Sequence, residues 1–457
     1  MAKLFLADRI LRKILKNFSW LLCGQILTAI ANFAYLSLTA HTLGVVAFGQ
    51  LILVRAYVEL IIGLTTFQSW QALIRYGADY LKNRDYLGFQ NLVKLTTCLD
   101  FLGSLGGYLI AVVAAPFIGP LVGWDAATIH DVQRVSILIL FTLSSTPIGL
   151  LRLYDRFDLL AVLQMVAPLV RLLGTAIAIW LEAPLVGYLL AWLSGEAANG
   201  LCLLAWGWWN TAKKPVFQEI NWSLKPLLRM KPQIFKFCLV SNLNSSLPLA
   251  ITLSPLIVGV FANPSAVALF RAGYEFSTPL KDLALLFTQS VYPELAHLSA
   301  KGRWRKFRNL LWKLGRILLG IGVTLLVAIL LGGKILLYYS MGSEFTAAYA
   351  PLVLLIMAGL FLMGNYLLEP ALFSMEMPHL SLRNNAIAIL LVYLPLLMIL
   401  AYYYGAWGAG LATLIANGIG FSLNLFCTWQ ELCLRQKKQQ QNRSSIQTKQ
   451  PIFPSKH

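Results

Sequence analysis

Several charged side chains of this chain lie inside long apolar stretches. Arg55 and Glu59 are one helical turn apart, and Arg271 and Glu275 repeat that spacing. A guanidinium group offers a planar fork of N–H donors that binds phosphate oxygens in bidentate fashion. Two hypotheses follow. Either the arginines line a solvated pathway and bind an anionic ligand, or they only neutralise the carboxylates beside them.

The longest polar face lies in residues 264–290. At about 100° per residue, one arc of a helix over this segment carries these polar side chains: Arg271, Tyr274, Glu275, Thr278, Lys281, Asp282 and Gln289. The opposite face is apolar and carries Ala272, Phe276, Leu280, Leu283 and Phe287. A charge in hydrocarbon costs about 2.5–3.5 kcal/mol on insertion scales. We therefore expect the polar face to border water or a ligand.

Two further segments have polar faces without charge. Residues 18–39 place Gln25, Thr28, Asn32, Tyr35 and Thr39 on one arc, and residues 235–257 offer Ser241, Asn244, Ser245 and Thr252. The predicted substrate-binding set is Gln25, Asn32, Arg55, Glu59, Arg171, Asn244, Arg271, Glu275 and Lys281. The purely structural alternative pairs Arg55 with Glu59, Arg171 with Glu196, Arg271 with Glu275 and Lys281 with Asp282.

Long apolar stretches must position these side chains. The composition is 58% hydrophobic and only 12% charged, far from that of a soluble domain. A bilayer core of roughly 30 Å needs about 20 apolar residues per helix. The sequence predicts twelve such helices, at 18–39, 46–66, 92–114, 134–152, 159–180, 185–207, 235–257, 264–290, 310–331, 350–370, 384–404 and 408–430.

The positive charges predict the orientation. Of the 37 lysines and arginines, nearly all of those outside the apolar stretches fall in alternate gaps, and Lys334 alone lies in the opposite set. The positive-inside rule then places both termini in the cytoplasm. The net charge of +18 reports this topology and contact with anionic membrane lipids, so we do not expect nucleic-acid binding.

The longest cytoplasmic linker, 208–234, divides the predicted helices six and six. We expect an amphipathic cytoplasmic segment at 1–17, an N-lobe at 18–207, a C-lobe at 235–430 and a disordered basic tail at 431–457. Because six is even, the lobes would be parallel, related by an axis along the membrane normal. The predicted fold is an all-α polytopic membrane protein with two parallel six-helix lobes around a central cavity.

Signals for catalysis or cofactors are missing. The six cysteines show no CxxC spacing, and the chain has no GxxxxGK[ST] phosphate loop and no dinucleotide fingerprint. We therefore expect no metal, no cofactor and no enzymatic activity.

At family level, the chain resembles the MOP (multidrug/oligosaccharidyl-lipid/polysaccharide) exporters, and within them the polysaccharide transporters of the Wzx type. The resemblance rests on LGVVAFGQLILVRAYVE (43–59), TQSVYPELAHLSAKGRW (288–304), GSEFTAAYAPLVLLI (342–356) and YYYGAWGAGLATLIA (402–416). It implies alternating access by two lobes that move a polyprenyl-diphosphate-linked oligosaccharide to the outer leaflet. A polysaccharide polymerase and a chain-length regulator would be partners.

Three other functions remain open. An ion-coupled multidrug exporter of the same superfamily would need exposed carboxylates, for which Asp100 and Glu369 are candidates. A membrane polysaccharide polymerase would need a sizeable external loop or a catalytic carboxylate loop, and neither is present. A non-transporting scaffold would leave the inward polar face without a purpose.

Overall fold

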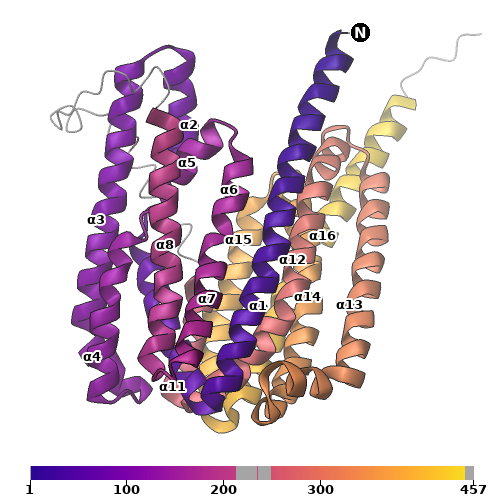
Figure 1. Cartoon of the computed structure of the whole chain (residues 1–457). Helices are drawn as coiled ribbons and strands as arrows, with labels where there is room; N and C mark the ends of the chain where they lie inside the picture. Colours follow the sequence, from indigo (N-terminus) through magenta and orange to yellow (C-terminus); the bar gives the residue numbers. More distant parts are fainter. Residues whose placement is uncertain (1, 213–233, 235–248, 448–457) are drawn as a thin grey trace, which may run out of the picture. The chain divides into compact units, whose positions relative to one another are not determined.

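The computed structural model describes residues 2–212, 234 and 249–447, and all regular elements in these ranges are helical (Figure 1). Eight candidate membrane spans occur in this part of the chain. Two of them, Leu27–Lys82 and Pro378–Lys437, have 56 and 60 residues, enough for two crossings each at about 20 residues per crossing. The all-helical membrane fold is thereby confirmed, while the count of twelve helices in two lobes stays a prediction.

By packing, the chain forms two units, and each is described by itself. Unit 1 comprises Met1–Ala268 with Ser340–Gly342, and unit 2 comprises Leu269–Tyr339 with Ser343–His457. The predicted linker at 208–234 lies mostly outside the described residues. The division by packing falls instead inside the helix that begins at Pro264.

The helices of unit 1 follow the predicted order with several additional breaks. They are α1 (Ala2–Thr65), α2 (Ser69–Lys82), α3 (Tyr86–Ile118), η1 (Gly119–Val122), α4 (Ala126–Val135), η2 (Ser136–Phe141), α5 (Ser145–Leu153), α6 (Phe157–Gln164), α7 (Val166–Trp180), α8 (Leu185–Ala212), α10 (Leu249–Thr252) and α11 (Ser254–Phe261). The predicted amphipathic segment 1–17 is continuous with the first membrane helix in α1.

Unit 2 contains the remaining helices. They are α12 (Pro264–Ala300, in this unit from Leu269), α13 (Trp304–Met341, to Tyr339), η5 (Ser343–Ala348), α14 (Tyr349–Ser374), α15 (Pro378–Ala386), the π-helical η6 (Ile387–Tyr393) and α16 (Leu394–Gln447). α16 extends past residue 430, where we predicted the last membrane helix to end. Arg435 holds the first turns of this extension, because its guanidinium pairs with Glu431 at 2.6 Å and donates to the Met375 carbonyl at 2.8 Å.

Glycines mark two of the predicted turns. Gly44 (φ 69°) interrupts α1 and Gly405 (φ 55°) interrupts α16, in the gaps predicted between the first and second and between the eleventh and twelfth helices. A positive φ is accessible to glycine without steric cost because it has no Cβ.

A buried carboxylate stabilises two helix breaks. The chain leaves helical geometry at residues 66–68, where the predicted second helix ends, and again at 142–144, inside the predicted fourth helix, where no break was predicted. Asp100 of α3 accepts hydrogen bonds from the Ser69 hydroxyl at 2.6 Å and from the Thr146 backbone N–H at 2.7 Å. The Ser69 hydroxyl also contacts that of Ser145 at 2.8 Å. Irregular backbone at membrane depth is tolerated where the protein satisfies its polar groups.

Unit 2 has its own buried polar network, formed by asparagines of α14, α15 and α16. Asn424 is fully buried. It accepts from Asn384 at 3.0 Å and donates to Asn365 at 3.1 Å and Asn385 at 3.3 Å. Asn385 in turn donates to the Glu369 carboxylate at 2.5 Å. One side chain thus links three helices.

Replacing Asn424 by leucine is therefore expected to destabilise the protein. The change leaves polar atoms of Asn384, Asn365 and Asn385 without their partner. We expect the free energy of unfolding to fall by about 1–3 kcal/mol, less than the sum of three lost bonds, because an unfolded helix in a membrane also finds partners. Thermal unfolding in detergent measures it, with Ser422→Ala on the exposed face of α16 as the control. Equal melting temperatures for both variants would contradict the structural role of the network.

Candidate functional site

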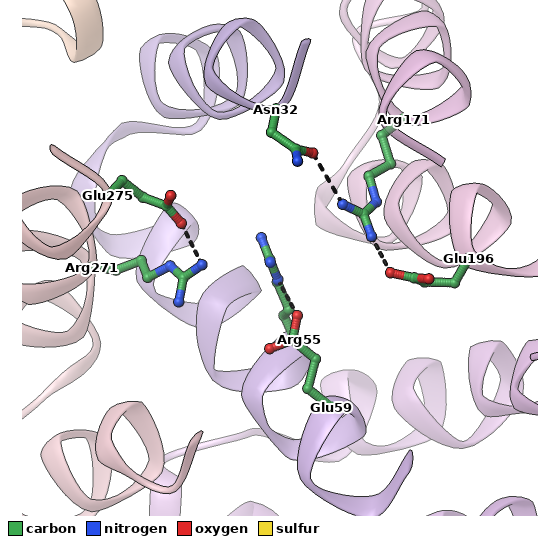
Figure 2. Close-up of polar contacts among 7 residues, drawn as sticks. All are labelled: Asn32, Arg55, Glu59, Arg171, Glu196, Arg271 and Glu275. Carbon is green, nitrogen blue, oxygen red and sulfur yellow. Dashed lines mark hydrogen bonds and ion pairs between the residues drawn. The ribbon is translucent and has the colours of Figure 1, made fainter. Parts of the chain in front are cut away.

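In unit 1, an arginine of α7 connects α1 with α8. The Arg171 guanidinium donates to the Asn32 side chain at 3.2 Å through one terminal nitrogen and pairs with Glu196 through the other (Figure 2). Gly195 makes room for this side chain, because a Cβ at that position would lie 2.6 Å from Cγ of Arg171. The side chain of Arg171 is 8% exposed and that of Glu196 is 31% exposed. The predicted pair is thus confirmed, and its carboxylate reaches a more open region.

Other polar groups continue this site along the three helices. Their spacing from Arg171, Asn32 and Glu196 is three or four residues, which places them on the same helix faces. Within the described chain, four buried atoms of this kind have no hydrogen-bond partner, and neither has Arg171 Nε. The four are Thr28 Oγ1, Thr175 Oγ1, Trp192 Nε1 and Asn199 Oδ1. We call Thr28, Asn32, Arg171, Thr175, Trp192, Glu196 and Asn199 the polar seam. Buried polar groups are almost always paired, so the seam is suited to polar atoms of a ligand or of water.

A second ion pair of unit 1 lies on α1. Arg55 Nε is 2.7 Å from the Glu59 carboxylate, as the spacing of four residues predicted. The Arg55 guanidinium also lies over the Trp192 ring, 5.7 Å from its centroid. Because Trp192 belongs to the polar seam, this cation–π contact joins the Arg55–Glu59 pair to the seam.

The third arginine lies in unit 2, on α12. Arg271 forms an ion pair with Glu275 one turn further on, and both side chains are 19% exposed (Figure 2). Its guanidinium carbon lies 5.6 Å from the centroid of the Tyr274 ring. The buried Nε of Arg271 has no acceptor among the described residues. The guanidinium therefore keeps a donor that the ion pair does not use.

The predicted apolar face of α12 is confirmed in part. Ala272 and Leu280 are buried and Phe276 is half-buried, whereas the side chains of Leu283 and Phe287 are not described. Leu280 packs on Gly359 of α14, where an added Cβ would lie 2.9 Å from it. Lys281 on the polar face is half-buried. The hydroxyl of Thr278, however, donates to the Tyr274 carbonyl of the same helix at 3.1 Å. This threonine satisfies its donor locally.

Some predicted residues lie outside what the structure describes. The side chains of Gln25, Asp282 and Gln289 and all of Asn244 are not described, so the predicted Lys281–Asp282 pair stays a prediction. In the described part, three of the four predicted ion pairs are present, involving Arg55, Arg171 and Arg271. Ion pairing alone does not separate the two hypotheses. Arg171 and Arg271 each have an unfilled Nε donor, and the paired carboxylates are partly exposed. Both features favour the hypothesis that an anionic ligand can compete with the carboxylates for these arginines.

The carboxylates proposed for drug export are engaged elsewhere. Asp100 is 6% exposed and satisfies the broken helices near Ser69 and Thr146. Glu369 accepts from Asn385 in the asparagine network. Asp100 therefore does not offer the exposed carboxylate that this alternative requires, whereas Glu369 is half-buried and held by Asn385.

The sequence analysis missed Thr175, Trp192 and Asn199. Their polar atoms are unusual only because tertiary packing buries them without partners. Their positions could have been selected from the sequence, because each lies three or four residues from Arg171 or Glu196 and therefore on the same helix face. No group of three or more His, Cys, Asp or Glu residues suited to a metal ion occurs among the described residues.

Two sequence comparisons find relatives of this chain. The sequence profile described as polysaccharide biosynthesis protein matches residues 14–299. The inner membrane protein YghQ of Escherichia coli (strain K12) is 28% identical over 352 residues, covering 76% of this chain and 98% of YghQ.

Solved structures show the same fold at low sequence identity. A multidrug resistance MATE family transporter of the MOP superfamily aligns with a TM-score of 0.73 and 15% identity, over 90% of this chain and 96% of that one. The lipid II flippase MurJ aligns with a TM-score of 0.70 and 13% identity, over 95% and 93%. The chain therefore has the same fold as these two proteins.

Proposed function

The chain belongs to the polysaccharide biosynthesis protein family, and from this membership we propose that it is a flippase for lipid-linked oligosaccharides. It moves a polyprenyl-diphosphate-linked oligosaccharide from the cytoplasmic to the outer leaflet for the synthesis of a surface polysaccharide such as O-antigen, capsule or exopolysaccharide. It acts by alternating access in the bacterial inner membrane with both termini inside. A polymerase and a chain-length regulator would take the product onward.

The structural observation that carries this proposal is a pair of arginines, Arg171 and Arg271, whose guanidinium groups each keep a donor that their ion pair does not use. A diphosphate presents several oxygens that accept charge-assisted hydrogen bonds, and guanidinium groups match their geometry. Arg171 and Arg271 each retain a buried, unfilled Nε donor within the described chain. The amides and hydroxyls of the polar seam, including Asn32, Thr28 and Asn199, suit the hydroxyl groups of a sugar.

The membrane potential supplies a direction for this transport. Moving one elementary charge across 100 mV changes the free energy by about 2.3 kcal/mol. When a doubly negative diphosphate leaves an inside-negative cytoplasm, its free energy therefore falls by roughly twice that amount. Outward movement of the headgroup therefore needs no nucleotide, in keeping with the missing phosphate-loop motif.

Deleting the gene tests the proposal. We expect lipid-linked repeat units to accumulate in the cytoplasmic leaflet and surface polysaccharide to fall, with both restored by the wild-type chain. Accessibility of the repeat unit to an external glycan-modifying enzyme, in intact cells and in permeabilised cells, measures the leaflet. Unpolymerised units on the outer leaflet would indicate a polymerase instead. Unchanged surface glycan together with drug sensitivity would indicate the multidrug exporter.

A further inference from the structure

Unit 2 contains a groove that the transport pathway proposed above does not use. It has a volume of about 440 Å³ and lies among α13, α14 and α16. This volume is within the range of small-ligand sites, about 300–1,000 Å³. Apolar side chains form most of its wall, among them Leu318, Leu326, Leu360, Phe361, Phe421 and Leu425.

Two arginines line the groove near one end of α13. They are Arg308 and Arg316, about 12 Å apart along the axis at 1.5 Å per residue. Arg308 makes one long hydrogen bond, 3.5 Å to the Gln436 side chain. No acidic residue is among the described residues that line the groove. The groove thus combines an apolar body with a doubly positive end.

The positions along α13 match one leaflet of a bilayer. From Arg316 to Leu326 the helix rises about 15 Å, which is half of the roughly 30 Å hydrocarbon core. Trp312 and Trp429 also line the groove, with ring centroids 6.1 Å apart in an edge-to-face arrangement. Tryptophan is enriched at the level of the lipid headgroups. Arginines and indoles therefore mark the headgroup level, and the apolar wall below them has the length of one acyl chain.

We propose that this groove binds a phospholipid with an anionic headgroup from the cytoplasmic leaflet. Its phosphate contacts Arg308 and Arg316, and one acyl chain lies along α13, α14 and α16. The positive-inside prediction places the Trp304 end of α13 in the cytoplasm, where anionic lipids attract basic residues. The match to a single leaflet favours a phospholipid over a much longer polyprenyl chain.

Binding of phosphatidylglycerol and phosphatidylcholine to the purified full-length protein, followed by native mass spectrometry, tests the proposal. We expect phosphatidylglycerol to bind more tightly. The double variant Arg308→Gln/Arg316→Gln should weaken its binding by roughly tenfold or more, because each basic residue near an anionic surface contributes about fivefold. Lys306→Gln/Lys313→Gln is the matched control, since both lysines are exposed on the same helix and do not line the groove.

A steric variant tests the apolar part separately. Gly315 lines the groove, and its nearest neighbour to an added Cβ is Leu367 at 3.8 Å, so Gly315→Leu can fill the space without clashing at Cβ. We expect it to weaken binding of both lipids. Gly320→Leu is the control, because a Cβ there meets nothing within 4 Å and Gly320 does not line the groove. Size-exclusion profiles confirm folding of each variant.

Three outcomes would overturn the proposal. They are equal binding of the two phospholipids, unchanged binding in both groove variants, and selective binding of polyprenyl phosphate with displacement of phosphatidylglycerol. The last would assign the groove to the transported lipid. The lipid-binding measurement does not depend on transport, so its failure leaves the flippase proposal standing, and a failed transport assay leaves the lipid site standing.

Discussion

Replacing Arg271 by alanine is expected to reduce transport of the lipid-linked oligosaccharide by roughly tenfold to a hundredfold. A hydrogen bond to a charged group contributes about 1.5–3 kcal/mol, and every 1.4 kcal/mol is a factor of ten. The unfilled Nε of Arg271 is the donor that we expect the diphosphate to use. Surface polysaccharide in a deletion strain, normalised to the amount of inserted protein, measures the effect.

Two further variants separate charge from geometry at this position. Arg271→Lys keeps a positive charge beside Glu275 but loses the planar fork, so we expect intermediate transport. Arg134→Ala serves as the control, because Arg134 forms a similar arginine–carboxylate pair with Asp131 on an exposed surface, with 80% of its side chain accessible. Full transport by correctly inserted Arg271→Ala would remove this residue from the substrate pathway.

Local spacing explains which parts of the site could be predicted from the sequence. Arg55–Glu59 and Arg271–Glu275 are pairs within one helical turn, and helix geometry alone brings such residues together. The buried face of α12 followed from the same periodicity, as Ala272 and Leu280 show. The breaks at Gly44 and Gly405 coincided with predicted turns because the hydrophobic runs end there.

Features that depend on tertiary packing could not be predicted in this way. Asn365 and Asn424 contact each other across 59 positions of the chain, and Asp100 reaches Thr146 across 46. Each of these residues alone resembles an ordinary polar side chain in an apolar helix. The Arg171–Glu196 pair could be predicted only because both residues were expected at similar membrane depth. That atoms of Thr175, Trp192 and Asn199 are buried without partners could be found only from the structure.

The Arg171–Glu196 pair allows a direct choice between the structural and the functional hypothesis. Removing one partner of a buried ion pair destabilises a protein by up to about 3–5 kcal/mol because the other charge is left unpaired. The 31% exposure of Glu196 lowers this cost, because the carboxylate is only partly buried. We therefore expect Arg171→Met alone to lower both the melting temperature and transport, which by itself does not separate stability from substrate binding.

The double variant Arg171→Met/Glu196→Leu separates the two. Replacing both charges by apolar groups of similar size is often neutral or stabilising, so we expect the melting temperature to return close to that of the wild type. If the pair only holds α7 against α8, transport returns with stability. If Arg171 binds the diphosphate, transport stays at least roughly tenfold below wild type in a well-folded protein, because the Nε donor and the positive charge are both gone. We expect the second result. A stable double variant with full transport would leave Arg171 as a structural residue, and the diphosphate would then have to be bound by Arg55, Arg271 or Lys281.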